Sequence, residues 1–343
     1  MIAFRLDANE SVATGHLYRC IAIAKECRKL GEECLFLLAE NLFTDIISEN
    51  GFEYEILNLK RNDWDDGIDK IKNCVLKNRI KCLVVDSYLV TENFFAKLSE
   101  TVSIFYIDDI CKKTYKIAEV LHYSEWEDEH VIENLYEGTE TKVIKGMKYM
   151  PLRNGFARPR EKNTQYDILI TTGGTDPYHI TQKVLARIAG ENYFEKLKVV
   201  AVLGRMNCDM DEIKKLAQSS KNIEVMFNIS NMDEVMRASR VAICAGGTSV
   251  YELMASGTVF TCFSFSDDQA IFGKKLDKHG NCLYAGDARE GADETAENIL
   301  LALKKMLERS YNENLTLAEE NQKLVDGLGA QRIAKELIAL SQN

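Results

Sequence analysis

The chain alternates strand-like and helix-like segments, and two glycine-rich turns join such segments far apart in the sequence. The first turn, residues 13–19, follows the apolar run Ile2–Leu6, and the second, residues 245–253, follows the apolar run 241–244. A strand that passes through glycine into a helix leaves free N–H groups and the positive end of the helix dipole at the turn, where they attract phosphate. The alternation predicts parallel sheets that bind ligands beyond the carboxyl ends of their strands.

The predicted fold class is α/β, with two doubly wound Rossmann-like domains facing a cleft. The chain has 343 residues, which is enough for two domains of ordinary size. The alternating pattern is clear up to residue 109 and restarts at residue 167, and Pro151 and Pro159 bracket a segment between these regions. We therefore predict an N-terminal domain over 1–150 and a C-terminal domain over 151–343, whose last helix can pack back on the first domain.

Composition excludes several classes of function. The net charge is −10 and there is no long basic run, so nucleic acid is a poor candidate for a partner. No apolar run approaches the ~20 residues of a membrane span, and the N-terminus reads as a strand rather than a signal peptide. The ten cysteines form no CxxC pair, which favours buried, reduced thiols in a cytoplasmic protein.

The first glycine turn carries residues that can do chemistry. His16 follows Gly15 at the start of a predicted helix, and Arg19 lies three residues further on. The positive end of the helix disfavours a protonated imidazole, so we expect His16 to remain available as a base. Asp7, after the first strand, is near enough in sequence to orient either side chain. The alternative is a histidine that only caps the helix.

A carboxylate and a phenol follow another buried strand. Asp86 ends the run 82–86, and Tyr88 comes two residues later. Because the carboxyl ends of parallel strands share one edge of the sheet, we expect both near His16, where they can bind sugar hydroxyl or amide groups. A helix cap with a packing aromatic is the alternative.

The second glycine turn predicts a diphosphate site. Gly246 and Gly247 let the backbone approach a ligand closely, and Thr248 or Ser249 is a natural N-cap that can also bind a phosphate oxygen. Glu252 projects from the same helix face and suits ribose hydroxyls. The alternative is an ordinary capped helix in which Glu252 bonds back to Ser249.

Two further turns belong to the same half of the chain. Gly173, Gly174 and Thr175 follow the strand 167–172 and form a second candidate anion-binding nest. Asp268 and Gln269 follow the strand 259–263, as sugar-hydroxyl ligands or as a solvated helix start. The adjacent acids at 267 and 268 also make a glycosidase an alternative, since glycosidases use two carboxylates at a defined separation.

Together these segments resemble the two-domain nucleotide-sugar enzymes of glycosyltransferase-B fold, and among them the UDP-sugar hydrolases of pseudaminic acid biosynthesis. The resemblance runs over nearly the whole chain. It rests on the segments 5–9, 15–19, 85–88, 107–109, 173–176, 231–232, 245–253 and 268–269.

The resemblance implies the roles of these residues. His16 would act on the water that attacks the anomeric carbon, and UDP would leave a UDP-linked 2,4-diacetamido-2,4,6-trideoxyhexose by C–O cleavage. No metal and no cofactor are implied, and we expect a monomer or weak dimer. Sugar contacts would come from Asp7, Gly15, Arg19, Asp86, Tyr88, Asp268 and Gln269. The nucleotide would be held by Gly173, Gly174, Thr175, Asn231, Met232, Gly246, Gly247, Thr248, Ser249 and Glu252.

The chain departs from the family's pattern at two places. Asp268 stands where the family commonly has asparagine, and residues 121–125 replace an asparagine-rich segment. We expect His122, within that segment, to be a surface histidine; the alternative is that it substitutes as a polar contact. Two alternatives to a hydrolase remain: a glycosyltransferase of the same fold, with His16 as base on an acceptor hydroxyl, and a nucleotide-sugar-binding protein without catalysis.

Overall fold

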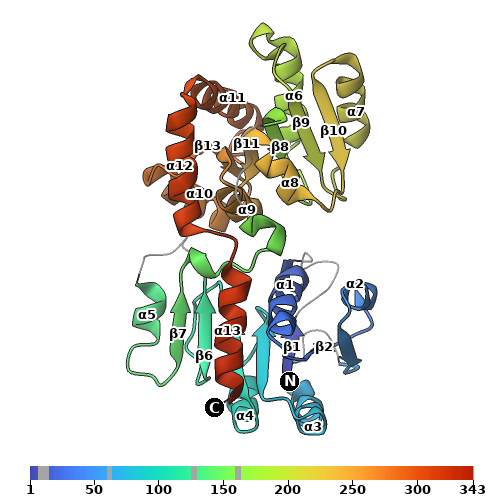
Figure 1. The fold of residues 1–343 in the computed structure, drawn as a ribbon, viewed down its shortest axis with the longest axis vertical. Helices are drawn as coiled ribbons and strands as arrows, with labels where there is room; N and C mark the ends of the chain where they lie inside the picture. The colour runs from blue at the N-terminus through green and yellow to red at the C-terminus, as the bar shows by residue number, and fades with distance from the viewer. Residues whose placement is uncertain (7–14, 60–63, 125–129, 159–163, 343) are drawn as a thin grey trace. The chain divides into compact units, whose positions relative to one another are not determined.

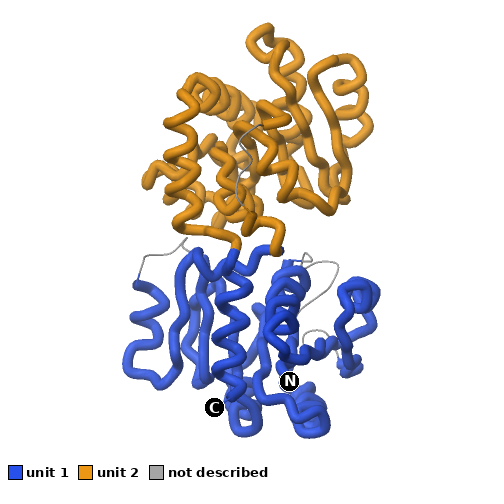
Figure 2. Tube along the Cα trace, viewed as in Figure 1, with its two compact units in different colours: residues 1–153, 328–343 blue, residues 154–327 orange. Residues whose placement is uncertain are grey.

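The computed structural model describes residues 1–6, 15–59, 64–124, 130–158 and 164–342, which form two compact units (Figure 2). One unit comprises Met1–Arg153 together with Leu328–Asn343, and the other comprises Asn154–Gly327. The first stretch thus ends three residues beyond the boundary predicted at residue 150. The C-terminal helix belongs to the first unit rather than to the second.

The first unit is built on one parallel sheet, which has seven strands in the described residues (Figure 1). The strands are β1 (Ile2–Leu6), β2 (Cys34–Leu38), β3 (Glu53–Ile56), β4 (Cys82–Asp86), β5 (Ser103–Ile107), β6 (Glu119–His122) and β7 (Lys142–Lys145). Their order across the sheet is β3-β2-β1-β4-β5-β6-β7. The central strands β1 and β4 are buried at every residue, as expected where helices cover both faces of a parallel sheet.

Helices cover this sheet and join its strands. They are α1 (Gly15–Lys29), α2 (Thr44–Glu49), α3 (Ile68–Asn78), α4 (Glu92–Ser99), α5 (Val131–Leu135) and α13 (Gly329–Gln342), with the 3-10 turns η1 (Asp65–Gly67) and η2 (Met147–Tyr149). The last helix, α13, packs against α1 (Figure 1). Its residues Ile333, Ala334 and Leu337 are fully buried. The end of the chain therefore supports the helix that carries His16.

The second unit repeats the architecture with a parallel sheet of six described strands. They are β8 (Tyr166–Thr171), β9 (Val199–Leu203), β10 (Ile223–Phe227), β11 (Ser239–Ala245), β12 (Val259–Ser264) and β13 (Leu283–Asp287). Their order is β10-β9-β8-β11-β12-β13. The helices are α6 (Ile180–Gly190), α7 (Met210–Ser219), α8 (Met232–Arg237), α9 (Thr248–Ser256), α10 (Asp267–Lys278), α11 (Ala292–Glu308) and α12 (Tyr311–Leu324), with the 3-10 turns η3 (Asn154–Ala157) and η4 (Asn192–Phe194).

The structure confirms the doubly wound α/β class in both units, but three strands escape the sequence pattern. β6 and β7 lie in a stretch without a clear period, where charged residues stand next to apolar ones. Glu119 at the start of β6 is buried and accepts a hydrogen bond from Lys142 of β7 at 3.1 Å, which explains an acid inside the sheet. The third, β13, lies in the C-terminal part of the chain, where the sequence pattern predicts mostly amphipathic helix, and it contains Gly286 at φ +116°.

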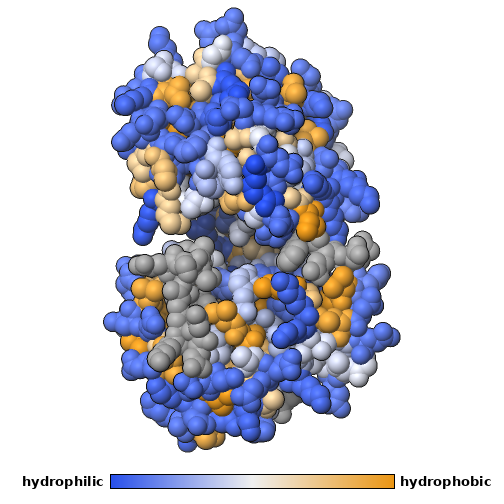
Figure 3. Space-filling model, turned by 180° about the vertical axis from the view of Figure 1, so that it is seen from behind, coloured by the Kyte–Doolittle hydropathy of each residue, from blue (hydrophilic) through white to orange (hydrophobic). Residues whose placement is uncertain are grey.

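The surface, the helices and the cysteines can be compared with the expectations drawn from composition. On the face drawn in Figure 3, apolar side chains are scattered among hydrophilic ones. Within the described residues, no helix combines the length and apolar character that crossing a membrane requires. All ten cysteines lie in the described ranges, and eight are buried, as the apolar pattern around them predicts. Cys34 is half-buried and Cys208 is exposed.

Candidate active site

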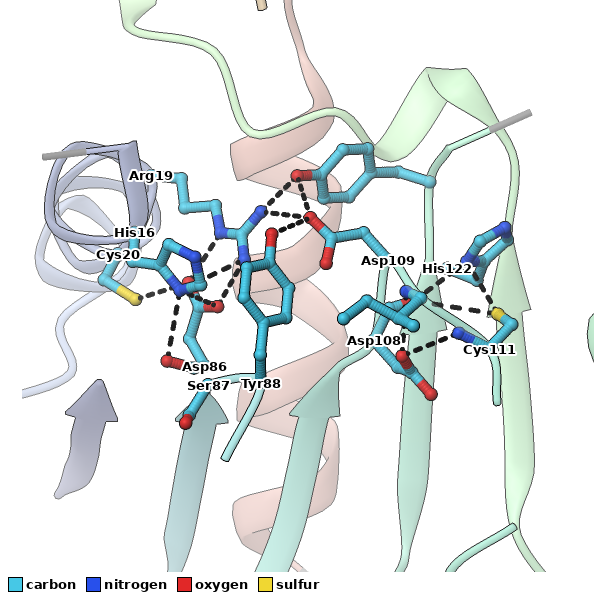
Figure 4. A network of polar contacts seen from close by, with 12 residues as sticks. His16, Arg19, Cys20, Asp86, Ser87, Tyr88, Asp108, Asp109, Cys111 and His122 are labelled. Carbon is cyan, nitrogen blue, oxygen red and sulfur yellow. Dashed lines mark hydrogen bonds and ion pairs between the residues drawn. The ribbon is translucent and has the colours of Figure 1, made fainter. Parts of the chain in front are cut away.

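His16 lies in the first turn of α1, and a carboxylate holds its ring. Its Nδ1 atom is 2.7 Å from Asp86 Oδ1 and 3.2 Å from the Asp86 carbonyl oxygen (Figure 4). A backbone carbonyl oxygen and an ionised carboxylate can only accept hydrogen bonds. We therefore assign the ring proton of His16 to Nδ1. The other ring nitrogen, Nε2, is then left as the basic atom of the neutral imidazole. Asp86 reaches His16 because β4 lies beside β1, the strand that leads towards α1.

The direction of the pKa shift of His16 differs from the sequence expectation. We expected the helix N-terminus to disfavour the protonated ring. Burial does lower the pKa of His16, but the Asp86 carboxylate outweighs burial, so the pKa lies above its ordinary value of 6.5. Burial opposes the charge on Asp86 in turn, but Arg19 and His16 hold the pKa of Asp86 well below its ordinary value. The expectation is wrong because it considered the helix dipole without the adjacent carboxylate.

Arg19 joins two carboxylates of this edge. Its Nε donates to Asp86 Oδ2 at 2.6 Å, and its Nη2 donates to Asp86 Oδ1. Its Nη1 donates to Asp109 Oδ2 at 2.9 Å and to the hydroxyl of Tyr123. Asp86 has no exposed surface and both its oxygens are bonded within the protein. Asp86 therefore has no exposed surface with which to make the sugar contact predicted for it, while Arg19 keeps 8% of its surface exposed.

Tyr88 stands against the His16 ring. The two rings are 4.8 Å apart at an interplanar angle of 85°, an edge-to-face arrangement. The Tyr88 hydroxyl donates to Asp109 Oδ2 at 3.2 Å, while 47% of the residue remains exposed. Tyr88 thus combines a fixed position beside the histidine with a surface that a ligand can contact.

Two residues of this cluster were not among the predicted site residues. Asp109 and Tyr123 follow β5 and β6, and the sequence signal was present in the Asp108-Asp109 pair and in the segment 121–125. Of the remaining predicted residues, Gly15 opens α1, and no atom of the described residues lies within 4 Å of the position of an added Cβ. Asp7 lies outside the described residues.

His122 is buried, which corrects the prediction of a surface histidine. Its Nδ1 atom donates to the Asp108 carbonyl oxygen at 2.8 Å and lies 2.9 Å from Cys111 Sγ (Figure 4). The reason is that β6 is an interior strand of the sheet, flanked by β5 and β7. His122 therefore ties the loop after β5 to the end of β6.

In the second unit, neighbouring strands carry the predicted glycine turns at one edge. The turn after β8 contains Gly173, at φ +82°, with Gly174 and Thr175. A Cβ at Gly204, after the adjacent β9, would lie 2.2 Å from the Gly173 carbonyl oxygen, so these two turns pack tightly. Met206 N donates to the Gly174 carbonyl oxygen at 3.1 Å, which links the turn after β9 to the turn after β8. A nest built this way offers backbone N–H groups to an anion.

The turn after β11 differs in its cap from the prediction. The N-cap of α9 is Gly247, without a side-chain cap, and Thr248 and Ser249 are its first helical residues. Both hydroxyls are thus not committed to capping. Glu252 lies one turn further along α9 and is half-buried.

Gln269 joins this turn from the next strand. A Cβ at Gly246 would lie 3.1 Å from Gln269 Cβ, and the Gln269 Oε1 atom accepts from Phe265 N at 3.1 Å. Asp268, its neighbour at the start of α10, is exposed. The structure therefore brings Gln269 to the Gly246–Gly247 turn, with Asp268 facing solvent beside it.

Asn231 and Met232 lie further along the sheet. They open α8 after the edge strand β10, which β9 and β8 separate from β11. Asn231 is exposed, and its Nδ2 donates to Glu234 Oε2 at 2.9 Å, while Met232 is buried. Sheet order thus does not place them beside the Gly246–Gly247 turn. Among the described residues, no group of three or more His, Cys, Asp or Glu side chains converges as a metal site.

Comparisons with known proteins agree with this architecture. Residues 168–337 match the glycosyltransferase family 28 C-terminal domain. An uncharacterised protein of Methanocaldococcus jannaschii is 27% identical over 274 residues, which cover 75% of this chain and 54% of that protein, so the chain spans about half the length of this relative. The UDP-2,4-diacetamido-2,4,6-trideoxy-β-L-altropyranose hydrolase of Campylobacter jejuni is 23% identical over 289 residues, which cover 81% of this chain and 97% of that enzyme.

The similarity to the Campylobacter enzyme confirms the resemblance drawn from the motifs. Among solved structures, MurG of Acinetobacter baumannii superimposes with a TM-score of 0.70 at 12% identity, covering 98% of this chain and 99% of that one. The chain therefore has the glycosyltransferase-B fold, and its residues 168–337 correspond to the C-terminal domain of glycosyltransferase family 28.

Proposed function

We propose that this chain is a UDP-sugar hydrolase that releases UDP and free sugar from a UDP-linked 2,4-diacetamido-2,4,6-trideoxyhexose. The comparisons support the coarser part of this statement, an enzyme that acts on UDP-sugars. The resemblance to the Campylobacter hydrolase supports the finer part, and the proposal extends to a place in pseudaminic acid biosynthesis. The observation that carries the proposal is the buried His16–Asp86 pair at the carboxyl edge of the first sheet.

This pair can generate a nucleophile from water. Asp86 holds the Nδ1 proton of His16, so Nε2 can accept a proton from a water molecule. The oxygen of that water forms a bond to the anomeric carbon, the bond between this carbon and the diphosphate oxygen breaks, and the electron pair leaves with UDP. Asp86 then stabilises the imidazolium electrostatically, since it stays ionised.

The second unit would hold the nucleotide and stabilise the leaving group. In this proposal, Gly247, Thr248 and Ser249 bind the diphosphate at the N-terminus of α9, where the helix dipole favours negative charge. Glu252 would bind the ribose and Gly173 to Thr175 would complete the anion site. Backbone near Asn231 and Met232 would read uracil, and Gln269 and Asp268 would contact the sugar.

A glycosyltransferase is the second candidate, and specific observations favour it. Residues 168–337 match a glycosyltransferase domain, and the structural neighbour MurG has the same fold. The same His16–Asp86 pair could remove a proton from an acceptor hydroxyl instead of from water. The two candidates differ in whether UDP release needs an acceptor.

The test measures UDP release from the diacetamido-altrose nucleotide in the absence of any acceptor. We expect the wild-type protein to turn over, and His16→Asn to lose at least about a hundredfold in kcat because it lacks the base. The matched control is His130→Asn, since His130 is exposed and bonds only Glu133 among the contacts found in the described residues. Full activity of His16→Asn contradicts the mechanism, and release that requires an added acceptor favours the transferase.

A further inference from the structure

Asp109 gathers three side chains from three parts of the first unit. Its Oδ2 atom accepts from Arg19 Nη1 of α1 at 2.9 Å and from the Tyr88 hydroxyl, after β4, at 3.2 Å. The same oxygen accepts from the Tyr123 hydroxyl, after β6, at 3.3 Å. One carboxylate oxygen thus fixes the tyrosine that stands against His16 and the arginine that holds Asp86.

The charges of this cluster are balanced only when His16 is protonated. Arg19 contributes one positive charge, and Asp86 and Asp109 contribute two negative charges, so the cluster carries −1 with a neutral imidazole and 0 with an imidazolium. A buried cluster favours the neutral total, because an uncompensated buried charge is costly. Cys20, Tyr88, Tyr106 and Tyr123 also face this cluster as uncharged donors, since burial raises the pKa of Cys20, Tyr88 and Tyr106. Asp108, beside Asp109, is a further buried acid, and burial raises its pKa, which opposes its charge.

The remaining oxygen of Asp109 is a further sign that the residue does more than support the fold. Oδ1 is buried and has no hydrogen-bond partner among the described residues. Buried polar atoms are nearly always bonded, so an exception is tolerated mainly where another requirement outweighs stability. A negative charge that is needed beside Arg19 is such a requirement.

We propose that Asp109 is a positioning residue for His16: its Oδ2 holds Tyr88 against the imidazole, and its charge stabilises the imidazolium that forms when His16 accepts a proton. The inference rests on the proposed function in that His16 is the base. The inference assigns to Asp109 an effect on His16 that passes through Tyr88 and through its charge beside Arg19.

The experiment compares Asp109→Asn, which removes the charge, with Asp109→Glu, which keeps it. The pKa of His16 is measured by NMR titration of labelled histidines, with His16→Asn used to assign the signal among the five histidines. The pH dependence of kcat for UDP release is measured in parallel. The matched control is Glu100→Gln, an exposed acid that pairs with Lys72 in the same unit.

In Asp109→Asn, the pKa of His16 falls, because a negative charge that favours the imidazolium is gone. The acid limb of kcat therefore moves to lower pH, and the plateau falls by about tenfold because the base is weaker. In Asp109→Glu, the pKa of His16 stays near the wild-type value while kcat falls, since the longer side chain displaces Tyr88. In Glu100→Gln, both quantities remain those of the wild type.

An unchanged pKa of His16 in Asp109→Asn overturns the proposal, and so do equal changes in the two Asp109 variants, which indicate only structural damage. If Asp109→Asn does not fold, Asp109→Glu decides alone, and a lowered pKa of His16 in that variant overturns the proposal. The NMR titration needs no turnover. Absence of UDP release from the wild type therefore contradicts the proposed function while leaving this inference testable.

Discussion

At the scale of single residues, Asp86 determines the properties of the candidate active site. It accepts from His16 and Arg19 with no surface exposed to solvent. A buried ion pair adds little net stability over an apolar pair, but removal of one partner leaves the other charge buried and uncompensated. Asp86 is therefore a residue whose loss affects both the fold and the chemistry.

We expect Asp86→Asn to lower the free energy of unfolding by about 3–5 kcal/mol, because the guanidinium of Arg19 loses a bidentate partner. The pKa of Asp86 is lower in the folded protein than its ordinary value of 3.8. The ionised carboxylate therefore contributes its full share of the free energy of unfolding at pH values above 3.8, and this share is lost as the pH falls from 3.8 through the lower pKa of the folded state. Urea unfolding at pH 7 and pH 3.5 measures both effects. A difference between wild type and variant that is small at pH 7, or that grows as the pH falls, contradicts the account.

The sequence predicted part of this cluster for a clear reason. His16, Arg19, Asp86 and Tyr88 were expected to meet because the carboxyl ends of parallel strands share one edge, and these four do come together. Asp109 follows β5 at the same edge, so its signal was present but not used, whereas Tyr123 was missed because its place depends on β6 lying beside β5. The order of strands is a tertiary property that the local pattern does not encode.

At the scale of elements, the second unit depends on close packing of its turns. The turns after β8 and β9 approach so closely that a Cβ at Gly204 would lie 2.6 Å from Gly174 Cα. The turn after β8 lies between the turns after β9 and β11, since β8 pairs with both β9 and β11. The backbone nest at Gly173 and Gly174 therefore has its shape fixed by a glycine about thirty residues away in the chain.

We expect Gly204→Ala to weaken UDP binding by at least about tenfold, because the added methyl group displaces the backbone of the nest. Gly190→Ala is the matched control, since Gly190 ends α6 with no described atom within 4 Å of its Cβ position and no positive φ. Isothermal titration with UDP measures both. Wild-type affinity in Gly204→Ala shows that the nest does not bind the nucleotide or that it adapts without cost.

Most helices and strands could be predicted from the spacing of apolar residues in the sequence. The elements that this spacing did not predict have physical explanations. β6 and β7 carry charged residues that pair across the strands, as Glu119 and Lys142 do, so the sequence shows no apolar run. The cap of α9 was assigned to a hydroxyl because Thr248 and Ser249 are good caps in isolation. The extended backbone of Gly247 takes that place instead.

At the scale of the whole molecule, the chain ends in the unit in which it began. Helix α13 follows the second unit and packs against α1 of the first. The stability of the helix that carries His16 and Arg19 therefore depends on residues more than 300 positions away in the sequence. A terminal amphipathic pattern predicts a helix but does not specify its partner; the sequence allowed the last helix to pack back on the first domain, and the structure assigns α13 to that unit.

We expect Leu337→Ala to destabilise the protein by about 2–5 kcal/mol, because Leu337 is fully buried on α13 and a cavity remains. Lys335→Ala, an exposed position on the same helix, is the control. Chemical denaturation followed by circular dichroism measures both. Equal stability of Leu337→Ala and wild type means that the α13 interface contributes little.

The central claim is that water attacks the anomeric carbon of a UDP-linked diacetamido sugar. The most direct measurement is UDP release in ¹⁸O-labelled water, without acceptor, from the diacetamido-altrose nucleotide and from its gluco- and N-acetylglucosamine-linked counterparts. The account predicts rapid release from the first donor alone, with no label in the UDP, since the bond to the sugar carbon breaks. Label in the diphosphate, or no release from any donor while UDP still binds, would contradict it.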